Sequence, residues 1–284
     1  MTVTVADTVA DTVADTLAGA VAETAASSGP RVFITGASSG IGAALAVRYA
    51  RDGATIGLFA RRETALRELA ASLPSSSQHR IYAGDVCDHA ALAAAAHDFI
   101  AHAGGIDIVI ANAGISHGTL TEVAEDLPVF EAIIATNVTA TVATFAPFIE
   151  AMREQGHGTL VGIASVAGVR GLPGGGGYSA SKAAVVTYCE ALRLEMRRHG
   201  IRVVTIAPGY IDTPMTRQNK YHMPFLMAPE RFADRAVRAI GGGVRYRVIP
   251  WQMGVVAKLL RWLPDALYDL AFARAPRKAR KSAP

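Results

Sequence analysis

The stretch Thr35-Gly36-Ala37-Ser38-Ser39-Gly40-Ile41-Gly42 decides the fold prediction for this chain. It follows a short apolar run at 31–35 and precedes a helix-period segment at 40–51. Glycines with the spacing G-x-x-x-G-x-G let the backbone turn tightly and approach a pyrophosphate, to which a helix N-terminus offers free N–H groups and a positive dipole end. A glycine pattern alone is weak evidence, but here the strand before it and the helix after it supply the context of a dinucleotide-binding loop.

Short apolar runs alternate with helix-period segments from residue 31 to residue 250. The runs expected to form strands are 31–35, 55–59, 80–83, 106–111, 159–164 and 201–207, with 246–249 as a further candidate. The segments expected to form helices are 40–51, 63–72, 90–102, 122–155 and 179–199, the fourth of which is interrupted by Pro128. Strands that are apolar on both sides and alternate with helices indicate a parallel sheet covered on both faces. We therefore predict a single three-layer α/β/α domain over 31–250.

The two ends of the chain differ in composition from this domain. The 284 residues carry a formal net charge of +4, to which residues 1–30 contribute −4 and residues 245–284 contribute +7, so the middle is left at +1. Residues 1–30 repeat the unit Val-Ala-Asp-Thr, and we expect a low-complexity acidic leader that is disordered or forms a helical arm. Residues 251–284 are expected to form an amphipathic helical extension with a basic tail.

Composition excludes several classes of protein. Hydrophobic residues make up 51% of the chain and charged residues 18%, which excludes a chain that is disordered or fibrous as a whole. No uninterrupted apolar run reaches the roughly 18 residues of a membrane span, and the N-terminus lacks the features of secretory and mitochondrial targeting segments. The two cysteines, Cys87 and Cys189, fit neither a disulfide framework nor a metal site. We therefore expect a cytoplasmic protein without a metal.

The end of the second predicted strand selects the nucleotide. A carboxylate at this place binds the ribose hydroxyls of NAD, whereas an arginine accommodates the 2′-phosphate of NADP. Ala60 stands where the carboxylate is expected, and Arg61 and Arg62 follow it. Because guanidinium groups make bidentate contacts with phosphate, we favour NADP(H) over NAD(H). The alternative is that the two arginines only begin a solvated helix.

A tyrosine and a lysine are candidates for acid/base chemistry. Tyr178 and Lys182 lie four residues apart at the start of a predicted helix, so both side chains share one face. A phenol with a pKa near 10 is a poor base at neutral pH, but a neighbouring ammonium lowers that pKa. The pair can therefore move a proton to or from a carbinol oxygen. Taken alone, such a pair is usually an incidental surface feature.

Polar residues that follow the predicted strands support this interpretation. Ser165 follows the run at 159–164, and Asn112-Ala113-Gly114 follows the run at 106–111. Both lie at the carboxyl edge of the sheet, where open α/β sheets bind their ligands. Asn137 lies inside a predicted helix, where a buried amide needs hydrogen-bonding partners.

These motifs together resemble the short-chain dehydrogenase/reductase family. The resemblance covers about residues 31–250 and rests on the order and spacing of TGASSGIG at 35–42, Asp85-Val86, Asn112-Ala113-Gly114, Asn137, Ser165, YSASK at 178–182 and Pro208-Gly209. It implies a Rossmann-type, doubly wound parallel sheet. It also implies NAD(P)-dependent oxidation of alcohols or reduction of carbonyls, and a homodimer or homotetramer.

The resemblance also implies a role for each matching residue. Tyr178 is the expected acid/base, Lys182 lowers its pKa and holds the nicotinamide ribose, Ser165 orients the substrate oxygen, and Asn137 holds a water of the proton relay. Gly36, Ser38, Ser39, Gly40, Ile41 and Gly42 form the expected pyrophosphate loop. The remaining cofactor contacts are expected from Arg61, Arg62, Asp85, Val86, Asn112, Ala113, Gly114, Pro208, Gly209, Ile211 and Thr213.

The class of substrate is predicted from a segment that is expected to form a lid. The segment 210–229 contains three methionines and three aromatic residues besides Leu226, and such side chains form an adaptable apolar cover. The alternative is that about half of them pack on the domain. We expect a lipophilic ketone or aldehyde, because no cluster of Lys or Arg in this segment marks an anionic substrate.

The C-terminal extension allows three interpretations. Residues 251–281 combine apolar positions at helical spacing with a basic tail, which can lie on an anionic membrane surface. The extension can instead pack on the domain or on a second subunit, with the tail solvated. No aromatic–basic module points to nucleic acid. A nucleotide-sensing or scaffold protein without turnover is the alternative to an enzyme, and the complete set of candidate catalytic residues argues against it.

Overall fold

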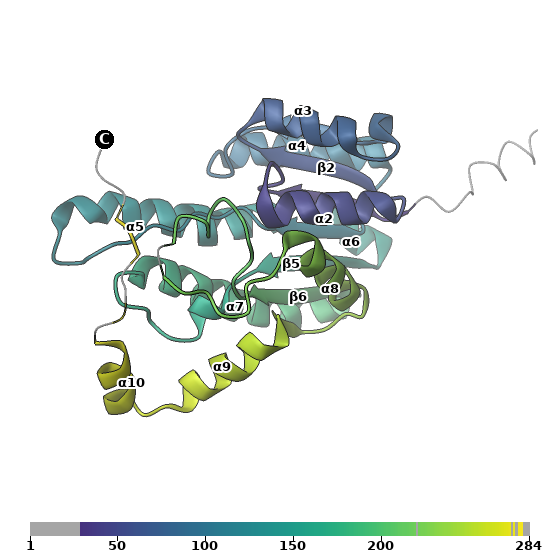
Figure 1. Ribbon diagram of the computed structural model, residues 1–284. Helices are drawn as coiled ribbons and strands as arrows, with labels where there is room; N and C mark the ends of the chain where they lie inside the picture. Colours follow the sequence, from purple (N-terminus) through teal and green to yellow (C-terminus); the bar gives the residue numbers. More distant parts are fainter. Residues whose placement is uncertain (1–28, 220, 274, 276–277, 281–284) are drawn as a thin grey trace, which may run out of the picture.

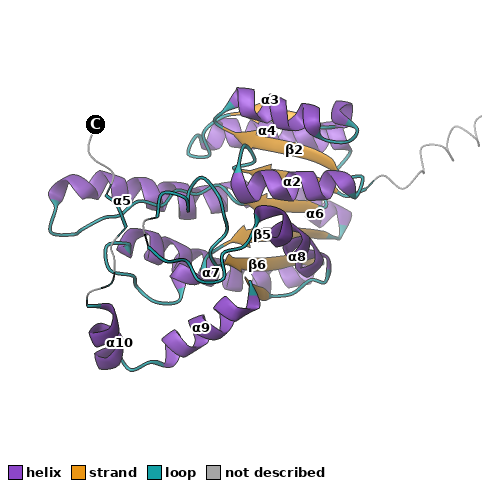
Figure 2. Ribbon diagram, in the orientation of Figure 1, coloured by secondary structure: helices purple, strands orange, loops and turns teal. Residues whose placement is uncertain are grey.

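A computed structural model describes residues 29–219, 221–273, 275 and 278–280. Its centre is one sheet of seven parallel strands in the order β3-β2-β1-β4-β5-β6-β7 (Figures 1 and 2). The strands are β1 (Arg31–Thr35), β2 (Thr55–Ala60), β3 (Arg80–Ala83), β4 (Ile108–Ala111), β5 (Gly158–Ile163), β6 (Ile201–Pro208) and β7 (Tyr246–Ile249). The predicted Rossmann-type parallel sheet is confirmed, including its seventh strand.

The strand order places a ligand crevice between β1 and β4. The chain runs outward from β1 through β2 to β3, then returns to the other side of β1 with β4 and continues to β7. Neighbouring loops therefore leave β1 and β4 toward opposite sides, which opens a crevice at the carboxyl ends of these strands. The glycine loop at 36–42 follows β1 at this point.

Helices cover both faces of the sheet, as Figure 2 shows. They are α2 (Gly40–Arg51), α3 (Glu63–Ser72), α4 (His89–Ala103), α5 (Leu127–Ile134), α6 (Ala140–Gln155), α7 (Gly176–Met196) and α8 (Pro229–Gly241). Alternate side chains of a strand point to opposite faces. Accordingly Val32 and Ile34 of β1 pack into the core that includes residues of α2, α3 and α8, whereas Phe33 packs into the core that includes residues of α4, α6 and α7.

The predicted helix at 122–155 differs from the structure. A short turn at Ala124–Asp126 leads into α5, Pro128 lies in the first turn of α5, and a π-helical turn at Ala135–Thr139 separates α5 from α6. Proline is tolerated in a first turn because the N–H it lacks has no intrahelical partner there. The helical stretch Ala124–Gln155 is long and apolar enough to cross a membrane by length and composition alone. No apolar stretch of this length is expected from the sequence, and this helical stretch corrects that expectation. Phe145, Phe148 and Met152 of α6 are nevertheless fully buried in the core.

The C-terminal extension forms two helices, α9 (Trp251–Trp262) and α10 (Asp265–Phe272). Met253 and Ala257 of α9 are buried. The guanidinium of Arg170 donates to the carbonyl oxygen of Leu263 (3.1 Å) and to the Asp265 carboxylate (3.0 Å), which ties α10 to the loop before α7. The extension thus packs in part on its own domain. The expected acidic leader lies outside the described residues except for Gly29 and Pro30.

Candidate active site

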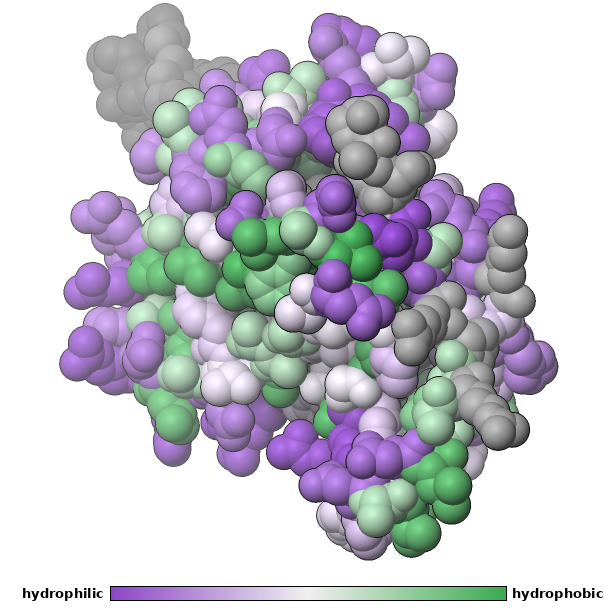
Figure 3. Space-filling view, turned by 90° about the vertical axis from the view of Figure 1, so that its left-hand side faces the viewer, coloured by the Kyte–Doolittle hydropathy of each residue, from purple (hydrophilic) through white to green (hydrophobic). Residues whose placement is uncertain are grey.

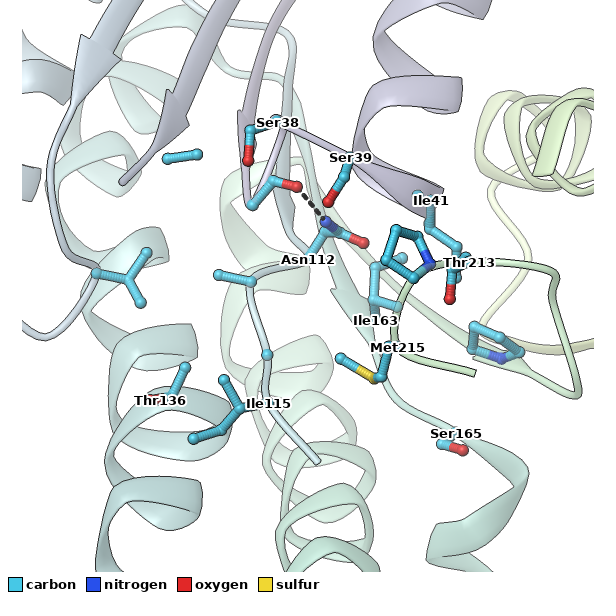
Figure 4. Close-up of a pocket in the computed structure, with 18 of the residues that line it drawn as sticks. Ser38, Ser39, Ile41, Asn112, Ile115, Thr136, Ile163, Ser165, Thr213 and Met215 are labelled. Carbon is cyan, nitrogen blue, oxygen red and sulfur yellow. Dashed lines mark hydrogen bonds between the residues drawn. The ribbon is translucent and has the colours of Figure 1, made fainter. Parts of the chain in front are cut away.

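A cleft of about 560 Å³ lies at the carboxyl edge of the sheet (Figure 4). It brings together almost all of the predicted site residues: Gly36, Ser38, Ser39, Gly40, Ile41, Arg61, Arg62, Asp85, Val86, Asn112, Ala113, Gly114, Ser165, Tyr178, Lys182, Pro208, Gly209, Ile211 and Thr213. Gly42 and Asn137 do not line it. Both are buried behind the lining residues, where they shape the cleft from within the protein.

The glycine loop forms a cradle that side chains would fill. Gly36 and Gly40 have φ angles of +68° and +57°, which glycine adopts without strain. A Cβ on Gly42 would collide with the carbonyl oxygen of Gly36, so Gly42 allows the loop to close on itself. Asn112 Nδ2 donates to the carbonyl oxygens of Thr35 (3.0 Å) and Gly36 (3.2 Å), which fixes the loop to the end of β4 (Figure 4). The open space and the N-terminus of α2 fit a pyrophosphate.

Two arginines border the adenosine end of the cleft. Arg62 Nη2 donates to Ser39 Oγ (2.7 Å) and to Ser38 Oγ (3.0 Å), so it bridges β2 to the glycine loop. Arg61 Nη1 lies 3.9 Å from Asp85 Oδ2, and both side chains are largely exposed. Ala60, the last residue of β2, also lines the cleft. Two cations and two serine hydroxyls are therefore available beside a strand end that carries no carboxylate.

Tyr178, Ser165 and Lys182 converge at the other end of the cleft. Ser165 follows β5 by two residues, and its Oγ accepts a hydrogen bond from Ala167 N (3.1 Å). The O–H of Ser165 is therefore free to donate, and Ser165 forms a hydrogen bond with Tyr178. Lys182 Nζ donates to the carbonyl oxygen of Ile163 (2.8 Å) and lies 5.9 Å from the centroid of the Tyr178 ring. The i, i+4 spacing in α7 places the tyrosine and the lysine on one face, as the sequence predicts.

Burial dominates the electrostatics of these groups. It raises the pKa of Tyr178, and the hydrogen bond from Ser165 opposes that rise. Burial also lowers the pKa of Lys182 to about 8, although its ammonium has a carbonyl partner. The expected lowering of the Tyr178 pKa by Lys182 stays a prediction.

Asn137 is fully buried in the π-helical turn between α5 and α6. Its Oδ1 accepts from Ile115 N (2.8 Å), and its Nδ2 donates to Ile115 O (3.0 Å) and to Ser181 Oγ (2.9 Å). The amide therefore joins the loop after β4 to α7 directly behind Tyr178 and Lys182. Its predicted role in holding a water is not tested by these contacts.

The segment 210–229 divides between lid and core. Met215 lines the cleft, and Met227 is buried against the domain. Phe225 and Leu226 are exposed, and the rings of Tyr210 and Tyr221 meet edge to face with centroids 6.3 Å apart. Part of the segment therefore lines the cleft, as expected for a lid, and part of it packs on the domain.

The basic tail contributes a residue that the sequence prediction missed. Lys278 Nζ donates to Ser116 Oγ (2.6 Å) and lies 5.7 Å from the centroid of the Tyr178 ring. Lys278 and Arg280 are thus docked on the domain, and for them the expectation of a solvated tail is wrong. Arg274, Arg277 and Lys281 lie outside the described residues. The contact joins residues 162 positions apart, so only the folded structure reveals it.

Comparisons with known proteins identify the family of this chain. Residues 30–223 match the sequence profile of the family described as short chain dehydrogenase. An uncharacterized oxidoreductase of Myxococcus xanthus is 37% identical over 244 residues, which cover 85% of this chain and 95% of the relative. Glucose 1-dehydrogenase of Gluconobacter oxydans is 35% identical, with 72% of this chain and 76% of the relative covered.

A solved structure supports the same assignment. The 3-ketoacyl-(acyl-carrier-protein) reductase of Brucella melitensis, complexed with NADH, superposes with a TM-score of 0.71 at 25% identity, covering 78% of this chain and 96% of the other. The fold is that of a dinucleotide-binding oxidoreductase. The chain belongs to the short-chain dehydrogenase/reductase family.

Proposed function

We propose that this protein is an NADP(H)-dependent oxidoreductase that transfers a hydride between nicotinamide and a carbonyl or secondary alcohol. The observation that carries the proposal is the convergence of Tyr178, Ser165 and Lys182 in the same cleft as the glycine loop. The nicotinamide, when bound, supplies or accepts the hydride. We propose a cytoplasmic enzyme that assembles as a homodimer or homotetramer.

The side chains supply the proton and the stabilising charge. In the reducing direction, Tyr178 donates its phenolic proton to the carbonyl oxygen as negative charge develops there. Ser165 donates a hydrogen bond to the same oxygen, and Lys182 contributes a positive charge in a site shielded from water. Because burial raises the pKa of Tyr178, the phenol is protonated at neutral pH and ready to act as the acid.

The cofactor preference rests on the end of β2. Arg62 stands within hydrogen-bonding distance of two serines of the glycine loop, and Arg61 lies beside it. A 2′-phosphate placed among these groups would meet two guanidiniums and no carboxylate from β2. The structure of the Brucella reductase contains NADH and therefore does not support a preference for NADP(H). The preference for NADP(H) is proposed from Arg61 and Arg62 of this chain.

The substrate is proposed to be a lipophilic ketone or aldehyde. Met215 on the cleft offers an apolar, adaptable contact, and Phe225 and Leu226 of the same segment are exposed. A turnover screen of ketones, aldehydes and alcohols with NADPH and NADH, or with their oxidised forms, identifies the class of substrate and the preferred cofactor.

Tyr178→Phe tests the reaction directly. Removal of the phenolic oxygen leaves the ring and the cleft in place, so we expect kcat to fall at least about 100-fold while the Kd for NADPH stays unchanged. Fluorescence titration with NADPH measures binding, and the absorbance of NADPH measures turnover. A nucleotide-sensing or scaffold protein without turnover is the alternative. It would show cofactor binding but no reaction in the unchanged enzyme with any member of the screen.

A membrane-peripheral reductase is a second candidate function. On α9, Trp251, Val255, Leu259 and Trp262 follow one another at helical spacing and are exposed, Trp262 to 79%. Leu267 and Leu270 of α10 are also exposed, and Figure 3 shows apolar surface at the lower end of the molecule, where the two helices lie. Lys258 and Arg261 stand between the apolar positions. Such a surface suits the interface of an anionic membrane.

A further inference from the structure

The C-terminal segment 278–280 forms a wall beside the candidate active site. Arg280 donates to both carboxylate oxygens of Asp126, at 2.8 and 3.1 Å, and Asp126 is almost completely buried. The same carboxylate accepts a hydrogen bond from Leu120 N (2.8 Å), so it also holds the loop after β4. In Figure 1 the short yellow segment 278–280 lies beside α5, and Asp126 directly precedes that helix. A bidentate ion pair between an exposed arginine and a buried carboxylate therefore anchors the segment at this place.

Backbone contacts fix the segment between Arg280 and the active site. Gly118 N donates to the carbonyl oxygen of Ala279 (2.9 Å). A Cβ on Gly118 would collide with the carbonyl oxygen of Lys278, so the segment fits only because residue 118 has no side chain. Side-chain and backbone contacts thus determine where Lys278 lies.

The ammonium of Lys278 lies at the margin of the cleft. It donates to Ser116 Oγ at 2.6 Å, and Ser116 directly follows Ile115, which lines the cleft. The ring of Tyr178 is 5.7 Å away, measured from Nζ to the ring centroid. Tyr178 and Ser165 line the cleft, whereas residues 278–280 do not, so the segment borders the reacting groups and leaves the cleft open.

The charge of Lys278 lacks a counter-ion within the described part of the chain. No carboxylate described there forms an ion pair with it, because Asp126 is held by Arg280. Burial lowers the pKa of Lys278, which reflects the cost of removing its charge from water. An ammonium has three N–H donors, and the contact with Ser116 uses one of them. A partly buried cation with free donors is suited to bind an anion.

We propose that Lys278 and Ser116 form a carboxylate-binding subsite, so that the substrate is an apolar oxo acid whose carbonyl reacts at Tyr178. This inference rests on the proposed function and narrows its substrate class. One ammonium and one hydroxyl match a singly charged carboxylate, whereas a phosphate usually takes a planar guanidinium or several donors. The apolar side chains of segment 210–229 would contact the rest of the substrate.

The first experiment compares medium-length oxo acids, with the carbonyl moved along the chain, with their methyl esters. The full-length enzyme is assayed with NADPH, and the quantity compared is the ratio of kcat/KM for acid and ester. A charged hydrogen bond predicts a ratio of about 10 to 100 in favour of the acid. Lys278→Met brings the ratio close to one, Lys278→Arg keeps most of it, and Arg197→Met, which removes an exposed cation at the far end of α7, leaves it unchanged.

Three results of this assay would overturn the subsite. The first is a ratio near one in the unchanged enzyme, and the second is a preference for acids that survives Lys278→Met. The third is a Lys278→Met variant that reduces acids and esters faster by the same factor, because that result identifies the segment as an obstruction. Thermal unfolding of each variant shows whether the segment remains docked. If the Lys278→Met variant is less stable, the acid-to-ester ratio of the Lys278→Arg variant, which keeps the positive charge, still tests the subsite.

The second experiment is independent of turnover. Calorimetry measures the binding of octanoate and octanamide to the full-length protein saturated with NADP⁺. We expect octanoate to bind at least about 10-fold more tightly than octanamide, and Lys278→Met to remove that difference. Equal binding of the two probes overturns the subsite. If octanoate binds through Lys278 but no carbonyl compound is reduced, the subsite stands and the proposed reaction is wrong.

Discussion

Arg62 contacts two serines of the glycine loop and Arg61 lies near Asp85, and the exchange of both arginines for alanine tests the cofactor preference. Each guanidinium–phosphate contact is worth about 1.5–3 kcal/mol, so Arg61→Ala/Arg62→Ala should raise the KM for NADPH at least about 10-fold more than the KM for NADH. Steady-state kinetics with both cofactors measures the two changes. Arg67→Ala is the matched control, since Arg67 is exposed on α3 and pairs with Glu63. Equal changes for the two cofactors would contradict the preference for NADP(H).

We expect the buried ammonium of Lys182 to lower the stability of the folded protein although the reaction requires it. Its ammonium is buried and its pKa is lowered to about 8, so the folded protein holds the charge less readily than the unfolded chain, where the pKa is near 10.5. Below pH 8 both states are protonated and the folded state bears the full penalty of the buried charge. Between about pH 8 and 10.5 the folded state releases its proton, and this part of the penalty is relieved.

We therefore expect Lys182→Met to raise the free energy of unfolding at pH 7 by the order of 1–3 kcal/mol while it abolishes turnover. This increase in the free energy of unfolding should become smaller as the pH rises through 8 toward 10. Urea unfolding of both proteins at pH 7 and pH 9.5 measures the difference. A methionine variant that is less stable at pH 7 would show that the contact with the Ile163 carbonyl outweighs the burial of the charge.

At the scale of elements, the sequence did not predict the π-helical turn or helix α8. A period of 3.6 residues between Pro128 and residue 155 predicts one uninterrupted helix, and one widened turn leaves that period almost unchanged. The strands are predicted well because each is a short apolar run next to a turn. The glycine loop is predicted well because all of its residues lie within one short stretch of sequence. Gly42 behaves differently from the rest of the loop: it packs against Gly36 behind the cleft instead of lining it.

The same turn explains why Asn137 is buried, and its substitution tests the role of the turn. Asn137→Ala removes three hydrogen bonds and leaves the N–H of Ile115 without its partner. An unsatisfied buried donor costs about 1–3 kcal/mol, so we expect a loss of that order in the free energy of unfolding, together with a lower kcat. Urea unfolding measures the loss, with Thr187→Ala on the exposed face of α7 as the control. A loss below about 0.5 kcal/mol would contradict a structural role for this amide.

At the scale of the whole molecule, the docking of segment 278–280 beside the sheet edge could not be predicted from the sequence. Arg280 and Asp126 lie 154 residues apart, and no local pattern links them. Composition identifies residues 274–281 as basic, and a basic tail is usually solvated. The structure instead places Lys278 against Ser116 and Arg280 against the buried Asp126, beside the candidate active site.

The exposed face of α9 and α10 gives the last prediction. Transfer of an exposed Leu or Trp side chain out of water is worth about 1.5–3 kcal/mol, and nearby Lys258 and Arg261 favour anionic lipids. We expect the full-length protein to float with phosphatidylserine-containing vesicles and to remain unbound with phosphatidylcholine vesicles. Leu259→Ser/Trp262→Ser should lower the bound fraction at least about 10-fold at limiting lipid, whereas Leu194→Ser, an exposed leucine on α7, should not. Equal flotation of all three proteins, or none with either lipid, would show that this face serves another contact, such as a second subunit.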